Sequence, residues 1–159
     1  MKCYSPVFIR SPNGGQKVSC GQCFACQANR RKEWAFRLKQ EMKHSQCSYT
    51  VTLTYDDCHL PPLESYSDDP VLAYLQTNDV CDLNSFYYHP LNIPDVQKFF
   101  KRLRKTGLQF RYFGVGEFGS HSNRPHYHII FFFKSAVIKS DFENLVVKKW
   151  GLGTQIVVD

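Results

Sequence analysis

Residues 124–133 read RPHYHIIFFF, the most informative segment of the sequence. It is a short, almost wholly aromatic and aliphatic run bounded by polar residues, a pattern typical of a buried β-strand. Residues two apart in a strand point to the same face, so His126 and His128 are expected to emerge together from one face of a sheet. Tyr127 is then expected on the opposite, buried face.

The strand expected before it, at 109–118, supplies a third polar side chain. A hairpin that pairs Glu117 with His126 also pairs Val115 with His128, which puts Glu117 on the histidine-bearing face. Two imidazoles and one carboxylate make an open site for a divalent cation, Mn²⁺ or Mg²⁺, with positions left for water and a phosphate oxygen. Two incidental histidines beside a surface carboxylate are the simpler alternative.

The remaining pattern indicates an α+β protein. The other expected elements are helices at 28–43, 92–105 and 140–150 and strands at 48–55 and 155–158. The strand at 48–55 alternates apolar residues with hydroxyls, and Ser140 and Glu143 match a helix-capping box. We expect one domain over residues 1–159, an antiparallel β-sheet with helices packed on one face, ferredoxin-like or RRM-like, plus a Cys-rich N-terminal segment.

Residues 1–27 form that Cys-rich segment and are expected to be irregular. Cys20, Cys23 and Cys26 have the spacing C-x2-C-x2-C, and Cys3 can supply a fourth thiolate. A structural Zn²⁺ ion bound there would tie the segment to the first helix. Free buried thiols or an iron–sulfur cluster explain the same spacing, so the alternatives stay open on sequence alone.

Charge is distributed unevenly along the chain, whose net charge is +6. No Lys or Arg lies between His44 and Gln97, and an acidic insertion at 56–90 holds seven carboxylates; the rest of the chain has 20 basic and seven acidic residues. This excess favours a nucleic-acid partner over a merely solvated basic surface. No apolar run approaches the roughly 20 residues of a membrane helix, so no membrane partner is expected.

Three blocks in this order resemble the replication initiators of gokushovirus-like Microviridae, small phages with single-stranded DNA. The blocks are CGQCFACQANRRKEWAFRLKQE at 20–41, SYTVTLTYDD at 48–57, and YFGVGEFG with RPHYHIIFF within 112–132. The resemblance implies the fold of a Rep-type HUH endonuclease, a site-specific single-strand endonuclease and nucleotidyl transferase. It assigns His126, His128 and Glu117 to the metal site, and a strand containing Thr52 and Thr54 to placing DNA.

The resemblance also implies a catalytic tyrosine, on a helix after the last strand, that attacks the phosphate and forms a 5′-phosphotyrosine link. None of the nine tyrosines starts a Tyr-x-x-Lys or Tyr-x-x-x-Tyr pattern. We therefore expect an N-terminal part of an initiator that lacks the nucleophile and does not nick DNA itself. Tyr55 and Tyr112 are the first candidates should any tyrosine here react.

The expected function is initiation of rolling-circle replication on a single-stranded viral origin, in the cytoplasm of a bacterial host and in contact with host replication machinery. Arg124, beside the histidines, and Arg30, Arg31 and Arg37, on the first helix, are the expected DNA contacts. A non-catalytic, zinc-stabilised module that binds single-stranded nucleic acid is the main alternative. A metal phosphohydrolase acting on small substrates is a third, which the charge distribution disfavours.

Overall fold

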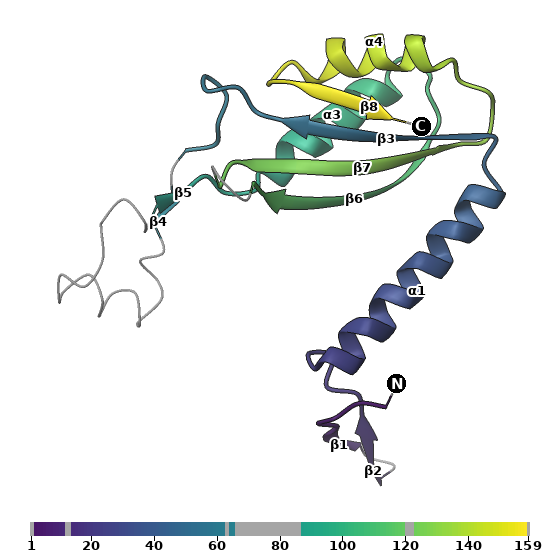
Figure 1. The fold of residues 1–159 in the computed structure, drawn as a ribbon, viewed down its shortest axis with the longest axis vertical. Coiled ribbons are helices and arrows are strands. Elements are labelled where there is room, and N and C mark those ends of the chain that lie inside the picture. Colours follow the sequence, from purple (N-terminus) through teal and green to yellow (C-terminus); the bar gives the residue numbers. More distant parts are fainter. Residues whose placement is uncertain (1, 12–13, 63, 66–86, 120–122, 159) are drawn as a thin grey trace. The chain divides into compact units, whose positions relative to one another are not determined.

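The computed structural model describes residues 2–11, 14–62, 64–65, 87–119 and 123–158. The elements are β1 (Val7–Ser11), β2 (Gly14–Val18), α1 (Phe24–Lys43), β3 (Cys47–Thr54), β4 (Glu64–Ser65), β5 (Tyr87–Tyr88), α3 (Ile93–Arg104), β6 (Arg111–Phe118), β7 (Pro125–Phe133), α4 (Lys139–Trp150) and β8 (Gln155–Val158) (Figure 1). They group into two compact units, Met1–His44 and Ser45–Asp159, referred to below as the N-terminal unit and the sheet unit. The single domain expected over the whole chain stays a prediction, and each unit is described by itself.

The sheet unit is built on a four-stranded antiparallel sheet with the strand order β6-β7-β3-β8. Together with the chain order β3-α3-β6-β7-α4-β8, this is the ferredoxin-like arrangement that the sequence predicted. The hairpin of β6 and β7 pairs Glu117 with His126 and Val115 with His128, which confirms the predicted register.

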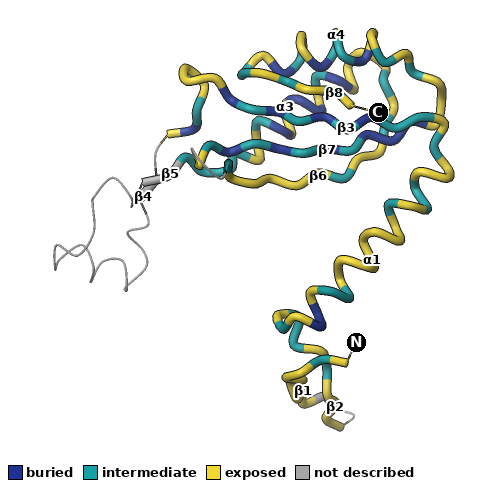
Figure 2. The backbone as a smooth tube through the Cα atoms, viewed as in Figure 1, coloured by how far each residue is buried: buried dark blue, intermediate teal, exposed yellow. Residues whose placement is uncertain are grey.

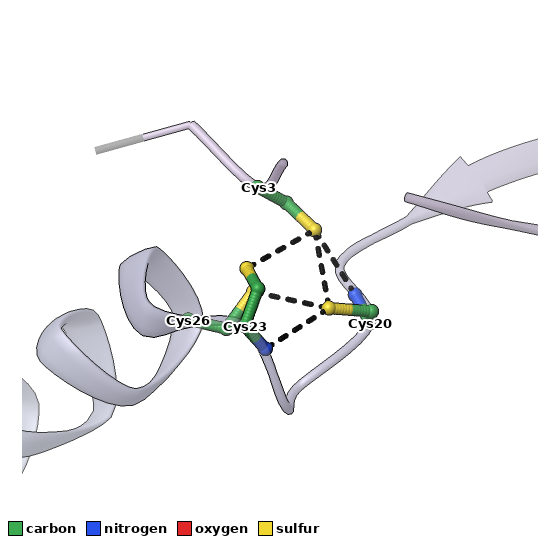
Figure 3. A group of neighbouring side chains, drawn as sticks. All are labelled: Cys3, Cys20, Cys23 and Cys26. Atoms are coloured by element: carbon green, nitrogen blue, oxygen red, sulfur yellow. Dashed lines mark hydrogen bonds between the residues drawn. The ribbon is translucent and has the colours of Figure 1, made fainter. Parts of the chain in front are cut away.

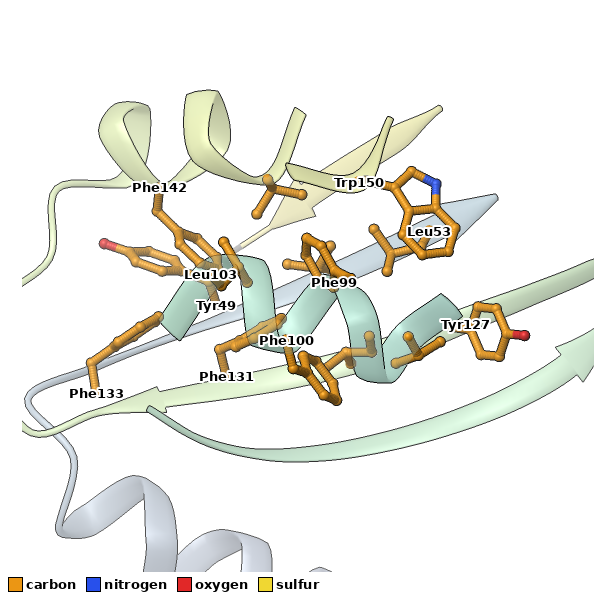
Figure 4. Packing of buried hydrophobic residues seen from close by; sticks show 14 of the residues in the cluster. Tyr49, Leu53, Phe99, Phe100, Leu103, Tyr127, Phe131, Phe133, Phe142 and Trp150 are labelled. Carbon is orange, nitrogen blue, oxygen red and sulfur yellow. The ribbon is translucent and has the colours of Figure 1, made fainter. Parts of the chain in front are cut away.

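One face of the sheet carries the hydrophobic core. Alternate residues of β3 and β7 pack there against the apolar sides of α3 and α4 (Figures 2 and 4). The core consists of Tyr49, Val51, Leu53, Tyr55, Val96, Phe99, Phe100, Leu103, Tyr127, Ile129, Phe131, Phe133, Phe142, Val146 and Trp150. Many of its rings meet edge to face, as Phe99 does on Phe131, and this geometry adds to the stabilisation from burying aromatic area. The opposite face, which carries the two histidines, is referred to below as the histidine face.

Hydrogen bonds fasten the end of β3 to the last helix and strand. The indole Nε1 of Trp150 donates to the carbonyl of Thr54 at 2.8 Å, and the amide of Asp56 donates to the carbonyl of Leu152 at 2.9 Å. Arg102, on α3, donates to the carbonyls of the last two residues of α4 at 2.7 and 3.2 Å. These bonds fix the strand end that lies beside the histidines of β7.

Two local predictions were wrong. The segment at 1–27 is not wholly irregular, because β1 and β2 pair as an antiparallel hairpin and α1 begins at Phe24 rather than at residue 28. The capping box is not formed either. Helix α4 begins at Lys139 after the N-cap residue Ile138, which makes no side-chain capping bond, and the amide of Phe142 donates to the Ile138 carbonyl at 3.0 Å.

Most of the predicted acidic insertion at 56–90 lies outside the described residues. Its described ends come together, since β4 pairs with β5 in antiparallel register. Within the described part of the chain, no helix has both the length and the apolar character needed to cross a membrane.

Candidate metal centre and nucleic-acid interface

Glu117, His126 and His128 converge on the histidine face of the sheet. The Oε1 atom of Glu117 lies 2.8 Å from Nε2 of His126 and 3.0 Å from Nε2 of His128. One ligand atom of each residue lies within 4.8 Å of the other two. The side chains of Glu117, His126 and His128 are 56%, 18% and 37% exposed, so a phosphate group can approach the cluster from solvent. The structure thus brings the three predicted ligands together.

Two hydrogen bonds orient the imidazoles. Nδ1 of His126 lies 3.2 Å from the carbonyl oxygen of Arg124 and can donate to it, and this contact directs Nε2 towards Glu117. The hydroxyl of Thr52 lies 3.0 Å from Nδ1 of His128, and this contact likewise directs Nε2 of that ring towards Glu117. Contacts of this kind fix the tautomer of histidines that bind metals.

This role of Thr52 was missed by sequence reasoning, which assigned the residue to placing DNA. The signal that could have found it is the alternation of β3. Its hydroxyl-bearing residues share the histidine face, and Thr52 lies directly opposite His128 in the register of β3 and β7.

The electrostatics of the cluster suit a divalent cation. Hydrogen bonds from His126, the larger effect, and from His128 hold the pKa of Glu117 below its ordinary value. An ionised carboxylate with two imidazole nitrogens is a donor set for Mn²⁺ or a similar ion, and three protein ligands leave coordination positions open for substrate. These residues therefore fit the metal that the resemblance implies.

Arg124 and Thr54 are placed beside this cluster but are already engaged. Arg124 donates to the carbonyl of Tyr55 at 2.9 Å and pairs with the carboxylate of Asp57. The hydroxyl of Thr54 donates to the carbonyl of Thr154 at 3.1 Å. A DNA phosphate that binds Arg124 has to compete with Asp57 for the guanidinium.

Within the sheet unit, no tyrosine whose side chain the structure describes lies on the histidine face. Tyr55 is buried on the core face, where its hydroxyl donates to Asp95 at 3.2 Å and lies 3.4 Å from that of Tyr127. Burial, above all, raises the pKa of both phenols. Tyr112 also lies on the core side, with its ring centroid 4.1 Å from that of Phe100. The expectation that Tyr55 or Tyr112 would be the first to react is therefore wrong.

The N-terminal unit holds a second cluster, made of Cys3, Cys20, Cys23 and Cys26 (Figure 3). The Sγ atom of Cys3 lies 3.5 Å from that of Cys20 and 3.9 Å from that of Cys23, and the sulfurs of Cys20 and Cys26 are 4.0 Å apart. All four are free cysteines. A regular tetrahedron with metal–sulfur bonds of about 2.3 Å has edges of about 3.8 Å, so the spacing fits one tetrahedral ion.

Backbone amides stabilise negative charge in this cluster. The amide of Cys20 donates to the sulfur of Cys3 at 3.3 Å, and the amide of Cys23 donates to the sulfur of Cys20 at 3.4 Å. Hydrogen bonds from the backbone of Tyr4, the largest effect, and of Cys26 lower the pKa of Cys23 to about 6. For Cys26, burial and the neighbouring sulfurs outweigh a lowering effect of the Gly21 backbone and raise the pKa to about 11.

The predicted DNA-contacting arginines of α1 are all exposed. Arg30, Arg31 and Arg37 lie on this helix of the N-terminal unit, and the guanidinium of Arg37 lies 5.3 Å from the centre of the Trp34 ring. Arg30 follows Cys26 by about one helical turn. Its guanidinium lies close to Gly21, next to the cysteine cluster, with Nη2 3.7 Å from the position that a Cβ atom on Gly21 would take.

Comparison with known proteins identifies the family. The model of the family described as replication-associated protein ORF2 matches residues 48–158. Over 72% of its length the chain is 32% identical to the replication-associated protein ORF2 of Spiroplasma virus 4, and over 81% it is 31% identical to the replication-associated protein VP4 of Bdellovibrio phage phiMH2K. The replication-associated protein ORF4 of Chlamydia phage 1 is 26% identical over 72% of the chain.

These matches cover 31%, 36% and 24% of the respective relatives, so the chain spans about a third of their length or less. No solved structure matches the chain. The family match covers the whole sheet except its first residue, Cys47, and includes both histidines and Glu117; it confirms the resemblance found in the sequence. The chain belongs to the family of the replication-associated protein ORF2.

Proposed function

We propose that this chain is the metal- and DNA-binding part of a rolling-circle replication initiator that nicks single-stranded origin DNA. The observation that carries the proposal is the convergence of Glu117, His126 and His128 on the face of the sheet opposite α3 and α4. The relatives, which are named replication-associated proteins of phages, support a role in replication. A non-catalytic binding module accounts for the basic charge, but it leaves the convergence of these three side chains unexplained.

The residues around the cluster are proposed to have three separate roles: binding the cation, orienting the histidines and contacting DNA. A cation bound by Glu117, His126 and His128 would offset the negative charge of the scissile phosphate and so favour in-line attack. Thr52 and the Arg124 carbonyl hold the two rings in the orientation that this requires. Arg124 and Thr54, at the same strand ends, are proposed to contact the DNA backbone.

The nucleophile is proposed to belong to a longer protein. In the resembling enzymes a tyrosine on a helix after the last strand attacks the phosphate, and a covalent link to tyrosine conserves the bond energy for rejoining. The greater length of the relatives leaves room for such a helix. We infer that the protein acts in the cytoplasm of a bacterial host, on the phage origin and beside the host replication machinery.

Titration calorimetry with Mn²⁺ tests the metal site on protein whose thiolates are first saturated with Zn²⁺. The wild type is expected to bind one Mn²⁺ with micromolar to millimolar affinity, as open sites do, and His128→Ala is expected to lose this binding. His44→Ala, which changes an exposed histidine of the N-terminal unit, is the matched control and is expected to bind normally. Equal binding by His128→Ala and the wild type would remove the metal centre, and a binding module would then be the better description.

We also propose that the ion held by the four thiolates is zinc. Sulfur atoms 3.5–4.0 Å apart suit one tetrahedral ion, whereas in a [4Fe–4S] cluster each thiolate binds its own iron, which holds the sulfurs farther apart. Purified protein is expected to contain one zinc ion per chain by elemental analysis. Cys23→Ser should lose the ion, while Cys58→Ser, at an exposed cysteine outside the cluster, should keep it. If wild-type protein is purified without metal and its thermal stability does not rise when zinc is added, the thiols are merely packed side chains.

A further inference from the structure

The net positive charge of the chain lies in the N-terminal unit, because the acidic insertion at 56–90 offsets the basic residues of the unit with the two metal-site histidines. Met1–His44 contains nine Lys or Arg residues and two Glu, a net charge of +7. Ser45–Asp159 contains eleven basic and twelve acidic residues, a net charge of −1. Attraction to a polyanion that is independent of sequence depends on such an excess, so the sheet unit by itself has little of it.

Helix α1 presents this charge together with exposed aromatic rings. Trp34 is 43% exposed and Phe36 63% exposed, unlike the buried rings of the core. Arg30, Trp34 and Arg37 are spaced at i, i+4 and i+7 and share one side of the helix, here named the Trp34 stripe. The contact between Arg37 and the Trp34 ring shows that the stripe is arranged with the aromatic face beside a cation.

Basic side chains interleaved with exposed aromatic rings are what proteins use to hold single-stranded nucleic acid. Cations follow the phosphates, and bases stack on the rings with little regard to sequence. Neither Trp34, which is 43% exposed, nor Met42, which is 53% exposed, is buried in a hydrophobic core. A ring that is kept accessible beside arginines is better explained by a ligand than by the protein's own core.

We infer that the N-terminal unit is a second binding site for single-stranded DNA, in which the Trp34 stripe stacks bases and neutralises phosphates while the histidine face binds the scissile bond. The identity of the ligand rests on the proposed function; the location of the site rests on charge and exposure. The Cys cluster precedes the stripe by one turn, since Cys26 lies four residues before Arg30. A metal ion held by Cys3, Cys20, Cys23 and Cys26 would therefore order the start of the helix that carries the stripe.

Tryptophan fluorescence of the full chain tests the inference directly. Of the two tryptophans, Trp150 is 1% exposed in the core, whereas Trp34 is accessible. Titration with oligodeoxythymidylate is expected to quench the emission of the wild type through stacking on Trp34. The variant Trp34→Phe keeps an aromatic ring and the helix, and it should show no quenching.

Charge variants test the electrostatic part. Arg30→Gln with Arg37→Gln, which removes both cations of the Trp34 stripe, should lower the slope of log affinity against log salt by about 1.4, since each phosphate contact with a single strand contributes about 0.7. Lys101→Gln with Lys148→Gln removes two exposed charges from α3 and α4 of the sheet unit, and it should leave the slope unchanged.

The outcomes separate this inference from the proposed function. The wild type could bind DNA without quenching of Trp34, and both double variants could show the same reduction in salt slope. The inference of a second site would then be wrong, while the initiator proposal would stand. A stripe covered by the sheet unit or by a second copy of the chain gives that same result. If the wild type does not bind the oligonucleotide at all, the DNA-binding part of the proposed function fails together with the inference.

Discussion

At the scale of single residues, the metal centre depends on side chains that bind no metal themselves. Thr52 on β3 contacts Nδ1 of His128, and the backbone of Arg124 contacts Nδ1 of His126. Each contact points the other ring nitrogen at Glu117. The alternation of the strands places the three ligands on one face, whereas hydrogen bonds to the far nitrogen of each ring set the orientation of the histidines.

Replacing Thr52 by valine keeps the branched shape of the side chain and removes only its hydroxyl. The His128 ring then loses the partner that fixes its orientation, so Mn²⁺ affinity is expected to fall about 10- to 100-fold, the usual effect of removing such a partner. Calorimetry on zinc-loaded protein measures it. Thr50→Val is the matched control, because Thr50 has the same face and strand but pairs with Ile130. An equal loss of Mn²⁺ affinity in both variants would mean that removing either hydroxyl disturbs β3 in general, and that the contact of Thr52 with His128 has no specific effect.

The thiolates should differ in reactivity once metal is removed. With its pKa at about 6, Cys23 is mostly thiolate at pH 7, whereas Cys26, with a pKa of about 11, is still a thiol. Alkylation at pH 7 after chelation, followed by mass spectrometry, should therefore modify Cys23 before Cys26. The rate at Cys23 should fall as the pH drops through 6, because protonation removes the nucleophile. Preferential labelling of Cys26 would contradict the hydrogen-bonding pattern of the cluster.

At the scale of the elements, the sequence predicted what strand periodicity dictates. The register that places Glu117 opposite His126 follows from one assumption about the hairpin, because a slip by one residue would move every side chain of the strand to the opposite face of the sheet. The β1–β2 hairpin was missed, although Asn13-Gly14 is a strong turn signal, because the short strands around it bury no apolar face. The capping box failed because Ser140 lies inside α4, whose first turn is fixed by the Ile138 backbone.

The connection between α4 and β8 passes so close to the end of β3 that only glycine fits at position 153. A Cβ at Gly153 would clash with the carbonyl oxygen of Thr54 and the amide nitrogen of Asp56, and neither backbone atom can move away cheaply. Gly153→Ala is expected to destabilise the fold by about 2–3 kcal/mol, the cost of overpacking a tight site. Gly151→Asn is the control, since nothing lies within 4 Å of a Cβ there and asparagine tolerates its left-handed conformation. Urea unfolding of both variants measures the difference, and equal midpoints would mean that the crossing relaxes freely.

At the scale of the whole molecule, the two faces of the sheet separate stability from chemistry. The core face takes most of the aromatic rings of the strands and helices, including the described tyrosines of β3, β6 and β7, whereas Phe113 and Phe132 lie on the histidine face. The histidine face keeps the carboxylate, the imidazoles and the threonine hydroxyls. The described part of the sheet unit thus offers a cation-binding cluster on a face that carries none of its described phenols.

The last prediction is that this chain binds single-stranded origin DNA but forms no covalent adduct with it, even with Mn²⁺ present. Tyr55 is unfit as a nucleophile for two reasons. Its ring is buried on the core face, and burial raises the pKa of its phenol above the ordinary value, so the reactive phenolate is disfavoured. Tyr127 shares both properties, and Tyr112 lies against Phe100 on the same side. A cation alone polarises the phosphate but supplies no attacking group of the protein.

A denaturing gel of the chain incubated with Mn²⁺ and labelled origin oligonucleotide checks this, with a native gel on the same mixture to show that binding occurs. Free oligonucleotide alone is expected on the denaturing gel, and a shifted complex on the native one. A covalent band would point to the exposed Tyr4 of the N-terminal unit, or to Tyr66, Tyr74, Tyr87 or Tyr88, whose side chains lie outside the described structure. Single phenylalanine variants of these five would then identify the nucleophile, because the core-face tyrosines cannot reach the histidine face without unfolding the sheet.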